Sequence, residues 1–242
     1  LRMAIGMFAI VAPLQLLVGD ISGKSVEQLQ PAKLAAIEAF WDTRTEQPFH
    51  IAAWPDRELA GNRWEISIPK LGSLITGGSA DAEIRGLKSF EPRDRPPVAV
   101  VFWAFRVMVG LGIAMIVLGL WGAWLCWKSA PERSRPYLMA AVAMGPAGFV
   151  AVIAGWVVAE VGRQPWVIYG VLRTEDAASP LLAGQVSLSL LGFLIVYAII
   201  FSVGVLYILR LIAEGPVAGS HELVDEDRAP GTPLAAMPED PG

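Results

Sequence analysis

Four long apolar segments constrain the fold of this chain more than any other feature. They occupy residues 1–19, 98–127, 137–161 and 182–212. A helix that crosses a bilayer needs about 20 predominantly apolar residues. Because lipid offers no partner to backbone N–H and C=O groups, each segment must satisfy them internally as a helix. The sequence therefore predicts an all-α membrane protein with four transmembrane helices.

The composition supports a membrane protein and bears on the first segment. Hydrophobic residues make up 54% of the chain and charged residues 17%, whereas a soluble domain carries about 25% charged residues. Arg2 stands near the start of the first segment, but the sequence "LVGDISG" at its end offers no small-residue cleavage site. A transmembrane helix is therefore favoured over a secretory signal peptide. Because the chain opens inside this apolar segment, we expect an upstream part of the protein to be missing.

Residues 20–97 form a long polar loop between the first two apolar segments. In "VEQLQPAKLAAIEAFW" (26–41) apolar residues recur three and four positions apart, which predicts a helix. "RWEISIPKLGSLI" (63–75) alternates and predicts a short strand or extended segment. Aromatic residues are spread through the loop, namely Phe40, Trp41, Phe49, Trp54, Trp64 and Phe90. We therefore expect a long ordered loop lying against the membrane surface.

The short connections set the expected topology. The link "KSAPERSRP" (128–136) has three basic residues and one acidic residue, which places it in the cytoplasm by the positive-inside rule. The loop 20–97 and the connection 162–180 then lie outside, in the periplasm. The tail 213–242 is cytoplasmic in this scheme. It is acidic and rich in Pro and Gly, so it is predicted to be disordered.

Five residues of the second and third segments and their ends are candidates for function. Ionisable side chains within a membrane cost about 2.5 to 3.5 kcal/mol each and are functional candidates by default; Arg106, Glu160 and Arg163 are of this kind. Trp156 precedes Glu160 by four positions and shares its helix face. The alternative for Glu160 and Arg163 is a simple ion pair at a helix end. The alternative for Met108 is ordinary packing in an apolar helix.

Three separated motifs resemble one known family. They are "GDISG…QPAKLAAIEAFW" at the start of the loop, "FWAFRVMVG" in the second segment, and "GRQPW" after a helix that ends in W-x-x-x-E. In this order they are similar to subunit I of the cytochrome bd quinol oxidases, including the cyanide-insensitive members, over about residues 1–212. The resemblance implies a respiratory terminal oxidase that oxidises membrane quinol on the outer side and reduces oxygen to water.

The resemblance also implies roles for individual residues. Met108 corresponds to the iron ligand of a low-spin haem b, and Arg106 to an arginine that stabilises this haem. Glu160 corresponds to the iron ligand of a high-spin haem b. Trp156 corresponds to a tryptophan between haems, and Arg163 to the arginine of the "GRQPW" signature. A third haem, either haem d or another haem b, is implied for the complete complex.

Lys33 and Glu38 correspond to the loop lysine and glutamate implicated in quinol oxidation. They are five positions apart, so they do not share one face of a helix. Both can contact one quinol only if the segment bends or the quinol lies across it.

The chain departs from the family in its number of segments. The family has nine transmembrane helices, and its histidine ligands belong to the earlier ones. This chain has four, with His50 in the loop and His221 in the tail, and both are expected to be solvated surface residues. We therefore expect the C-terminal part of a subunit I, inactive alone, in the bacterial inner membrane. Its expected partners are the missing N-terminal part, subunit II, lipid, quinol and oxygen, with no nucleic acid.

Two other classes of function stay open. A four-helix membrane scaffold or assembly protein could have kept the helices and lost the redox role, although the full set of candidate residues argues against decay of the site. A small transporter could use Glu160 and Arg163 as a charge relay, but no internal repeat or broken-helix pair is apparent. The single Cys126 excludes an intramolecular disulfide and a multi-cysteine metal site.

Overall fold

The computed structural model describes residues 1–128, 131–179, 181 and 183–215. Within them, four helical stretches are long and apolar enough to cross a membrane, namely Arg2–Leu29, Pro92–Lys128, Arg135–Val161 and Ala183–Glu214. The predicted fold class, a helical membrane protein with four spanning helices, is confirmed. The chain divides into two compact units, Leu1–Ala178 and Ser179–Gly242.

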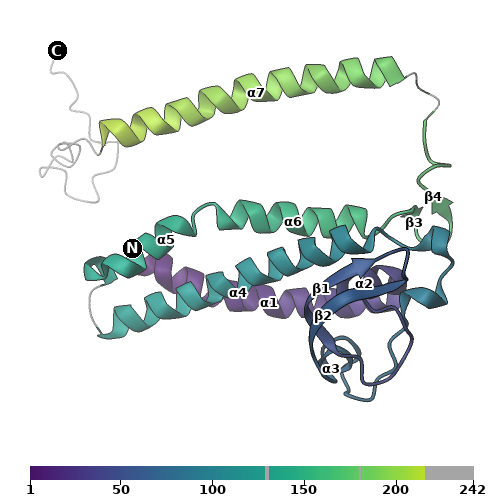
Figure 1. Ribbon diagram of the computed structural model, residues 1–242. Coiled ribbons are helices and arrows are strands. Elements are labelled where there is room, and N and C mark those ends of the chain that lie inside the picture. Colours follow the sequence, from purple (N-terminus) through teal and green to yellow (C-terminus); the bar gives the residue numbers. More distant parts are fainter. Residues whose placement is uncertain (129–130, 180, 182, 216–242) are drawn as a thin grey trace, which may run out of the picture. The chain divides into compact units, whose positions relative to one another are not determined.

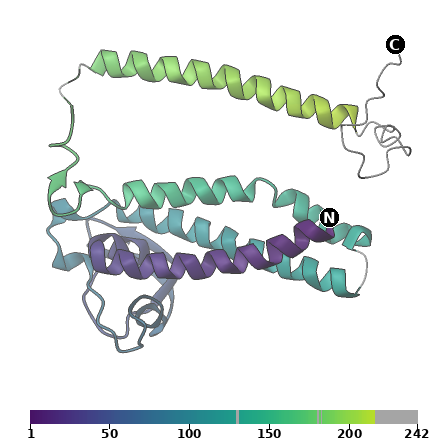
Figure 2. The same ribbon diagram turned by 180° about the vertical axis from the view of Figure 1, so that it is seen from behind.

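Three membrane helices of the first unit pack side by side (Figures 1 and 2). Helices α1 (Arg2–Leu29) and α6 (Ala147–Val161) both contact α4 (Val98–Lys128). A Cβ added at Gly119 of α4 would lie 3.2 Å from the backbone of Ala9, so the missing side chain lets α1 approach closely. Most apolar side chains of the bundle surface stay exposed, as lipid or further protein contacts would require.

The third apolar segment is interrupted rather than continuous. Helix α5 (Arg135–Ala143) ends before Met144–Pro146, and α6 follows. Proline has no backbone N–H and its ring clashes with the preceding turn, so Pro146 cannot continue α5. The predicted single helix over 137–161 is therefore two helices that together cover the length of one membrane span.

The first helix runs ten residues beyond its predicted end and stops at Leu29, before Pro31. Gln30 adopts non-helical dihedrals (φ −141°, ψ 65°), as expected for a residue that precedes proline. Pro31 then starts α2 (Pro31–Glu38), where a missing N–H costs nothing. The prediction of one helix within 26–41 is therefore wrong. The segment contains the end of α1, a break, and the separate helix α2.

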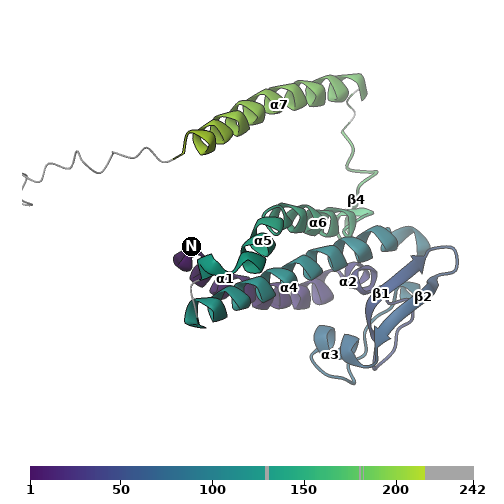
Figure 3. The same ribbon diagram turned by 60° about the vertical axis from the view of Figure 1, so that its left-hand side comes forward.

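The rest of the loop contains short helices and strands. Strands β1 (Phe49–Asp56) and β2 (Gly61–Ile68) form an antiparallel hairpin. The strand predicted over 63–75 is confirmed for 63–68 and wrong for 71–75, which begin a helix. Figure 3 shows the hairpin and α3 (Leu71–Gly77) at the end of the bundle where α4 begins. Short 3₁₀ turns, η1 (Leu87–Ser89) and η2 (Pro92–Asp94), lead into α4. One apolar core joins α2, β1, η1 and the start of α4.

The remaining elements are short or stand in the second unit. A 3₁₀ turn η3 (Pro131–Arg133) precedes α5, and strands β3 (Trp166–Ile168) and β4 (Leu172–Arg173) follow α6. The second unit is described by the single helix α7 (Ala183–Glu214), whose apolar side chains are exposed on all sides. The predicted tail begins within the last residues of α7, and its residues 216–242, with His221, lie outside the described part.

Candidate functional site

A buried ion pair joins the loop to the membrane helices. Glu38 is the last residue of α2, and Arg106 lies in the third turn of α4. Their side chains are 4% and 10% exposed, and Arg106 Nη2 donates to Glu38 Oε2 at 2.7 Å. A charge at such a position is tolerated only with a partner, and removing one partner strongly destabilises the other. The pair therefore fixes the end of α2 on α4.

Arg106 is held by further contacts. Its Nε and Nη2 donate to the backbone carbonyl of His50, at 2.8 and 2.6 Å. Its guanidinium carbon lies 4.8 Å from the ring centre of Phe49 and 4.4 Å from that of Phe102, distances at which a cation is attracted to the ring. Nη1 is buried without a hydrogen-bond partner among the described residues. One donor of Arg106 is thus left for a group outside this chain's described atoms.

His50 is buried, so the prediction of a solvated surface histidine is wrong. It is 3% exposed, and its Nδ1 lies 2.8 Å from the backbone oxygen of Glu38. The last carbonyls of a helix lack intrahelical donors, and this histidine supplies one to α2. The ring also packs edge-on against Phe40, with centres 5.7 Å apart. A register shift in β1 between His50 and Ala52 brings both His50 and Ala53 into the core, which simple alternation along the sequence does not indicate.

Met108 faces the neighbouring membrane helix. A Cβ added at Gly155 of α6 would lie 2.9 Å from Met108 Sδ, closer than real Cβ atoms come. The glycine therefore makes room for the thioether between α4 and α6. Sequence reasoning missed Gly155, although a glycine directly before Trp156 was a visible signal of close packing.

The end of α6 carries an ion pair, as the simpler alternative predicted. Arg163 donates to Glu160 one turn earlier, and the two side chains are 36% and 45% exposed. Trp156, one turn before Glu160, is 66% exposed. Within the first unit this face of α6 is therefore open, and it presents an aromatic ring and a carboxylate.

The side chain of Lys33 reaches the end of α6. Its Nζ donates to the backbone oxygen of Ala159 at 3.2 Å. Burial lowers the pKa of Lys33; the positive charge of Arg163 lowers it further, and the negative charge of Glu160 acts in the opposite direction. Lys33 and Glu38 thus point to different membrane helices, α6 and α4, which confirms that they do not share a helix face.

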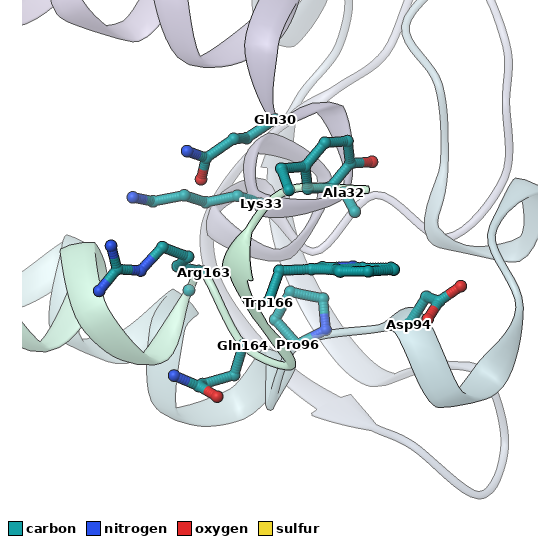
Figure 4. A pocket seen from close by; sticks show the side chains of 10 residues that line it. Gln30, Ala32, Lys33, Asp94, Pro96, Arg163, Gln164 and Trp166 are labelled. Atoms are coloured by element: carbon teal, nitrogen blue, oxygen red, sulfur yellow. The ribbon is translucent and has the colours of Figure 1, made fainter. Parts of the chain in front are cut away.

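A narrow crevice lies between α2 and the segment that follows α6. It has about 170 Å³ of empty space, part of it open to solvent, and Lys33, Arg163, Gln164 and Trp166 help to line it. Figure 4 shows the side chains of Lys33 and Arg163 extending in the same direction from it. The crevice brings the "QPAK" and "GRQPW" motifs together, although 129 positions separate Lys33 from Gly162.

A second tie holds the segment after α6 in place. Arg173 of β4 pairs with Asp94 of η2, and its guanidinium carbon lies 4.7 Å from the ring centre of Trp166. Both side chains of the pair are less than one quarter exposed. Sequence reasoning missed this pair, because its members are 79 positions apart and lie outside the apolar segments.

Comparison with known proteins decides the family. A family model described as cytochrome bd terminal oxidase subunit I matches residues 1–216. The chain belongs to this family. The resemblance of its three motifs is thereby confirmed, and membership implies haem cofactors and a place among the terminal oxidases. Within the described residues, no group of three His, Cys, Asp or Glu side chains is placed to hold a metal ion.

Individual members of the cytochrome bd family give the extent of the similarity. Cytochrome bd ubiquinol oxidase subunit 1 of Bacillus subtilis is 30% identical over 220 residues, which cover 85% of this chain and 46% of that protein. Cytochrome bd-II ubiquinol oxidase subunit 1 of Escherichia coli is 29% identical, covering 90% and 55%. The solved bd oxidase from Geobacillus thermodenitrificans superposes with a TM-score of 0.75 at 26% identity, covering 89% and 49%. The chain spans about half the length of these proteins.

The glycine of "GRQPW", Gly162, gives a stability prediction. A Cβ at position 162 would crowd the Val158 carbonyl and lie 3.2 Å from Lys33 Cγ. Gly162→Ala is therefore expected to displace the Lys33 stem and to cost about 1–3 kcal/mol, the usual cost of overpacking. The measurement is thermal unfolding of the detergent-solubilised oxidase. Gly112→Ala is the control, because nothing lies within 4 Å of its added Cβ; equal melting of both variants would contradict the prediction.

Proposed function

We propose that this chain supplies the quinol-oxidising loop and two haem-binding helices of a bd-type quinol:oxygen oxidoreductase. Family membership supports the reaction class. The observation that carries the proposal is the buried Glu38–Arg106 pair, which joins a loop carboxylate to the helix of the candidate ligand Met108. Oxidase activity is expected from the assembled complex and not from this chain alone.

The residues present fit haem groups. Arg106 Nη1 is a buried donor that lacks a partner among the described residues, and a haem propionate is an anion that it can bind. Met108 would hold the low-spin haem b, since a thioether is an established axial ligand that raises the iron potential. Glu160 would hold the high-spin haem b from the open face of α6, beside Trp156 and Arg163. When bound, the haems supply one-electron transfer and oxygen reduction; haem d or a further haem b would complete the set.

Glu38 and Lys33 have distinct roles in the proposed quinol reaction. Arg106 holds the Glu38 carboxylate at the end of α2, and a carboxylate there can accept a proton from a quinol hydroxyl. Lys33 presents an ammonium donor at the end of α6, suited to a quinol oxygen. Because the two side chains reach different helices, a quinol that contacts both lies across α2.

The proposed orientation follows from the connecting segments. The loop that holds α2 and the hairpin lies in the periplasm, and the link between α4 and α5 lies in the cytoplasm of a bacterium. Protons from quinol are then released outside. Subunit II and the rest of subunit I, which carries the histidine ligands in this proposal, are the protein partners.

A difference spectrum tests the proposal. Purified oxidase containing this chain should show reduced-minus-oxidised bands of haem b and should consume oxygen when quinol is added. Absence of haem and of quinol-dependent oxygen uptake from the assembled complex would favour the non-catalytic scaffold.

Met108→Leu tests the low-spin ligand. Leucine conserves the side-chain volume, so the packing cost is expected to be below about 1.5 kcal/mol, while the iron ligand is lost. The low-spin haem b signal should disappear or change to a high-spin spectrum, with the protein still inserted. Met139→Leu is the control, because Met139 is 64% exposed on α5. An unchanged low-spin spectrum in Met108→Leu would make Met108 a packing residue.

A further inference from the structure

His50 contacts both members of the buried ion pair. Its side chain reaches the backbone oxygen of Glu38, the last residue of α2. Its own backbone oxygen accepts two hydrogen bonds from Arg106 of α4. No other residue described in the structure bonds to both partners of the pair. His50 thus connects three elements, α2, β1 and α4, at one point.

The surroundings of the ring fix which nitrogen acts on Glu38. A carbonyl oxygen only accepts hydrogen bonds, so Nδ1 must carry the hydrogen and donate it to Glu38. Nε2 lies on the other side of the ring, 3.1 Å from the carboxylate of Glu65, in a geometry that does not make a hydrogen bond. His50 and Glu65 also help to line a pocket of about 210 Å³, together with Trp41 and Asn62. The two ring nitrogens therefore face different environments.

We propose that His50 is a positioning residue for quinol oxidation, and that it acts through Nδ1–H. By holding the Glu38 carbonyl it fixes the end of α2, and with it the carboxylate that pairs with Arg106. This inference rests on the proposed quinol reaction. A role in packing alone would depend on the ring of His50 and its contact with Phe40. The proposed role depends instead on one ring nitrogen, Nδ1.

Two substitutions of His50 distinguish the role of Nδ1 from that of Nε2. The amide nitrogen of asparagine reaches the place of Nδ1, and that of glutamine reaches the place of Nε2. Both variants lose the aromatic ring, so each is the packing control of the other. His50→Asn should keep the donor to Glu38 and stay within about twofold of the natural KM for quinol. His50→Gln should raise this KM about 2- to 10-fold, the effect expected for one neutral hydrogen bond, with less change in kcat.

Hydrogen–deuterium exchange gives a readout that does not depend on turnover. In the purified oxidase, amides of residues 33–41 should exchange faster in His50→Gln than in His50→Asn, because the end of α2 is released. Glu65→Ala tests the other side of the ring and alters a 40% exposed side chain. It should leave both the quinol KM and the exchange of residues 33–41 unchanged.

The outcomes are distinguishable. Equal effects of His50→Asn and His50→Gln, or a larger effect of His50→Asn, would overturn the proposal. A raised KM in Glu65→Ala would also overturn it, because it would assign the role to Nε2. If the natural oxidase failed to oxidise quinol, the proposed function would fall, while the order of exchange rates would still decide whether His50 holds α2.

Discussion

Replacing Arg106 by leucine is expected to abolish quinol-driven oxygen uptake and to destabilise the loop. The change leaves the Glu38 carboxylate, 4% exposed, without its cation. Breaking a buried ion pair from one side costs about 3–5 kcal/mol, because the remaining charge is neither hydrated nor paired. The measurements are the melting temperature of the purified oxidase and its oxygen uptake with quinol and with an artificial electron donor that bypasses the loop.

A double variant separates stability from function. In Glu38→Leu/Arg106→Leu both charges are gone, and an apolar pair of similar size often equals a buried ion pair in stability. We expect its melting temperature to recover most of the loss, while quinol oxidation stays absent. Arg57→Leu is the surface control, since Arg57 is exposed and bonds only to a backbone oxygen among the described residues. Full quinol oxidation in the double variant would show that the pair is structural only.

Replacing Glu160 by glutamine is expected to empty or perturb the high-spin haem b site. The amide conserves volume but removes the negative charge and is a poor iron ligand. Oxygen reduction should fall more than about tenfold, since even changes around a metal ligand cost about 10- to 100-fold. The low-spin haem should be retained. Haem content and the high-spin absorbance of the purified complex are the measurements.

The competing interpretation of Glu160 predicts a small effect. If Glu160 only forms a partly exposed ion pair with Arg163, the pair contributes about 0–1 kcal/mol to the free energy of unfolding. Its loss would then leave both haems in place. Glu214→Gln is the control, because it removes the charge of a helix-end pair with Arg210, a pair that is more exposed than that of Glu160. A full high-spin complement in Glu160→Gln would refute the ligand role.

The sequence predicted the elements whose formation depends on local composition. The four apolar helices follow from segment length alone, and the strand at 63–68 follows from alternation. Two helix breaks were missed although Pro31 and Pro146 were visible. In both places an apolar or periodic pattern continued through the proline, and the pattern was given more weight than the loss of the N–H.

The candidate site was predictable in its residues but not in its contacts. The motifs identified Glu38 and Arg106 separately, yet their pairing across 68 positions depends on how α2 folds back on α4. His50 was assigned to the surface because it stands in the polar loop, outside the membrane segments. Its burial follows from a carbonyl at the end of α2 that needs a donor, and such a need appears only when both segments are placed.

The two anchor points of α2 make its length significant. Lys33 is tied to α6 and Glu38 to α4, and five helical residues separate them by about 7.5 Å along the axis. The length of α2 therefore sets the distance between its contacts with the two membrane helices. An insertion of one residue between the anchors would rotate the second by about 100° and lift it off its partner. At this place in the loop, the spacing and the angle of the two anchors are set together.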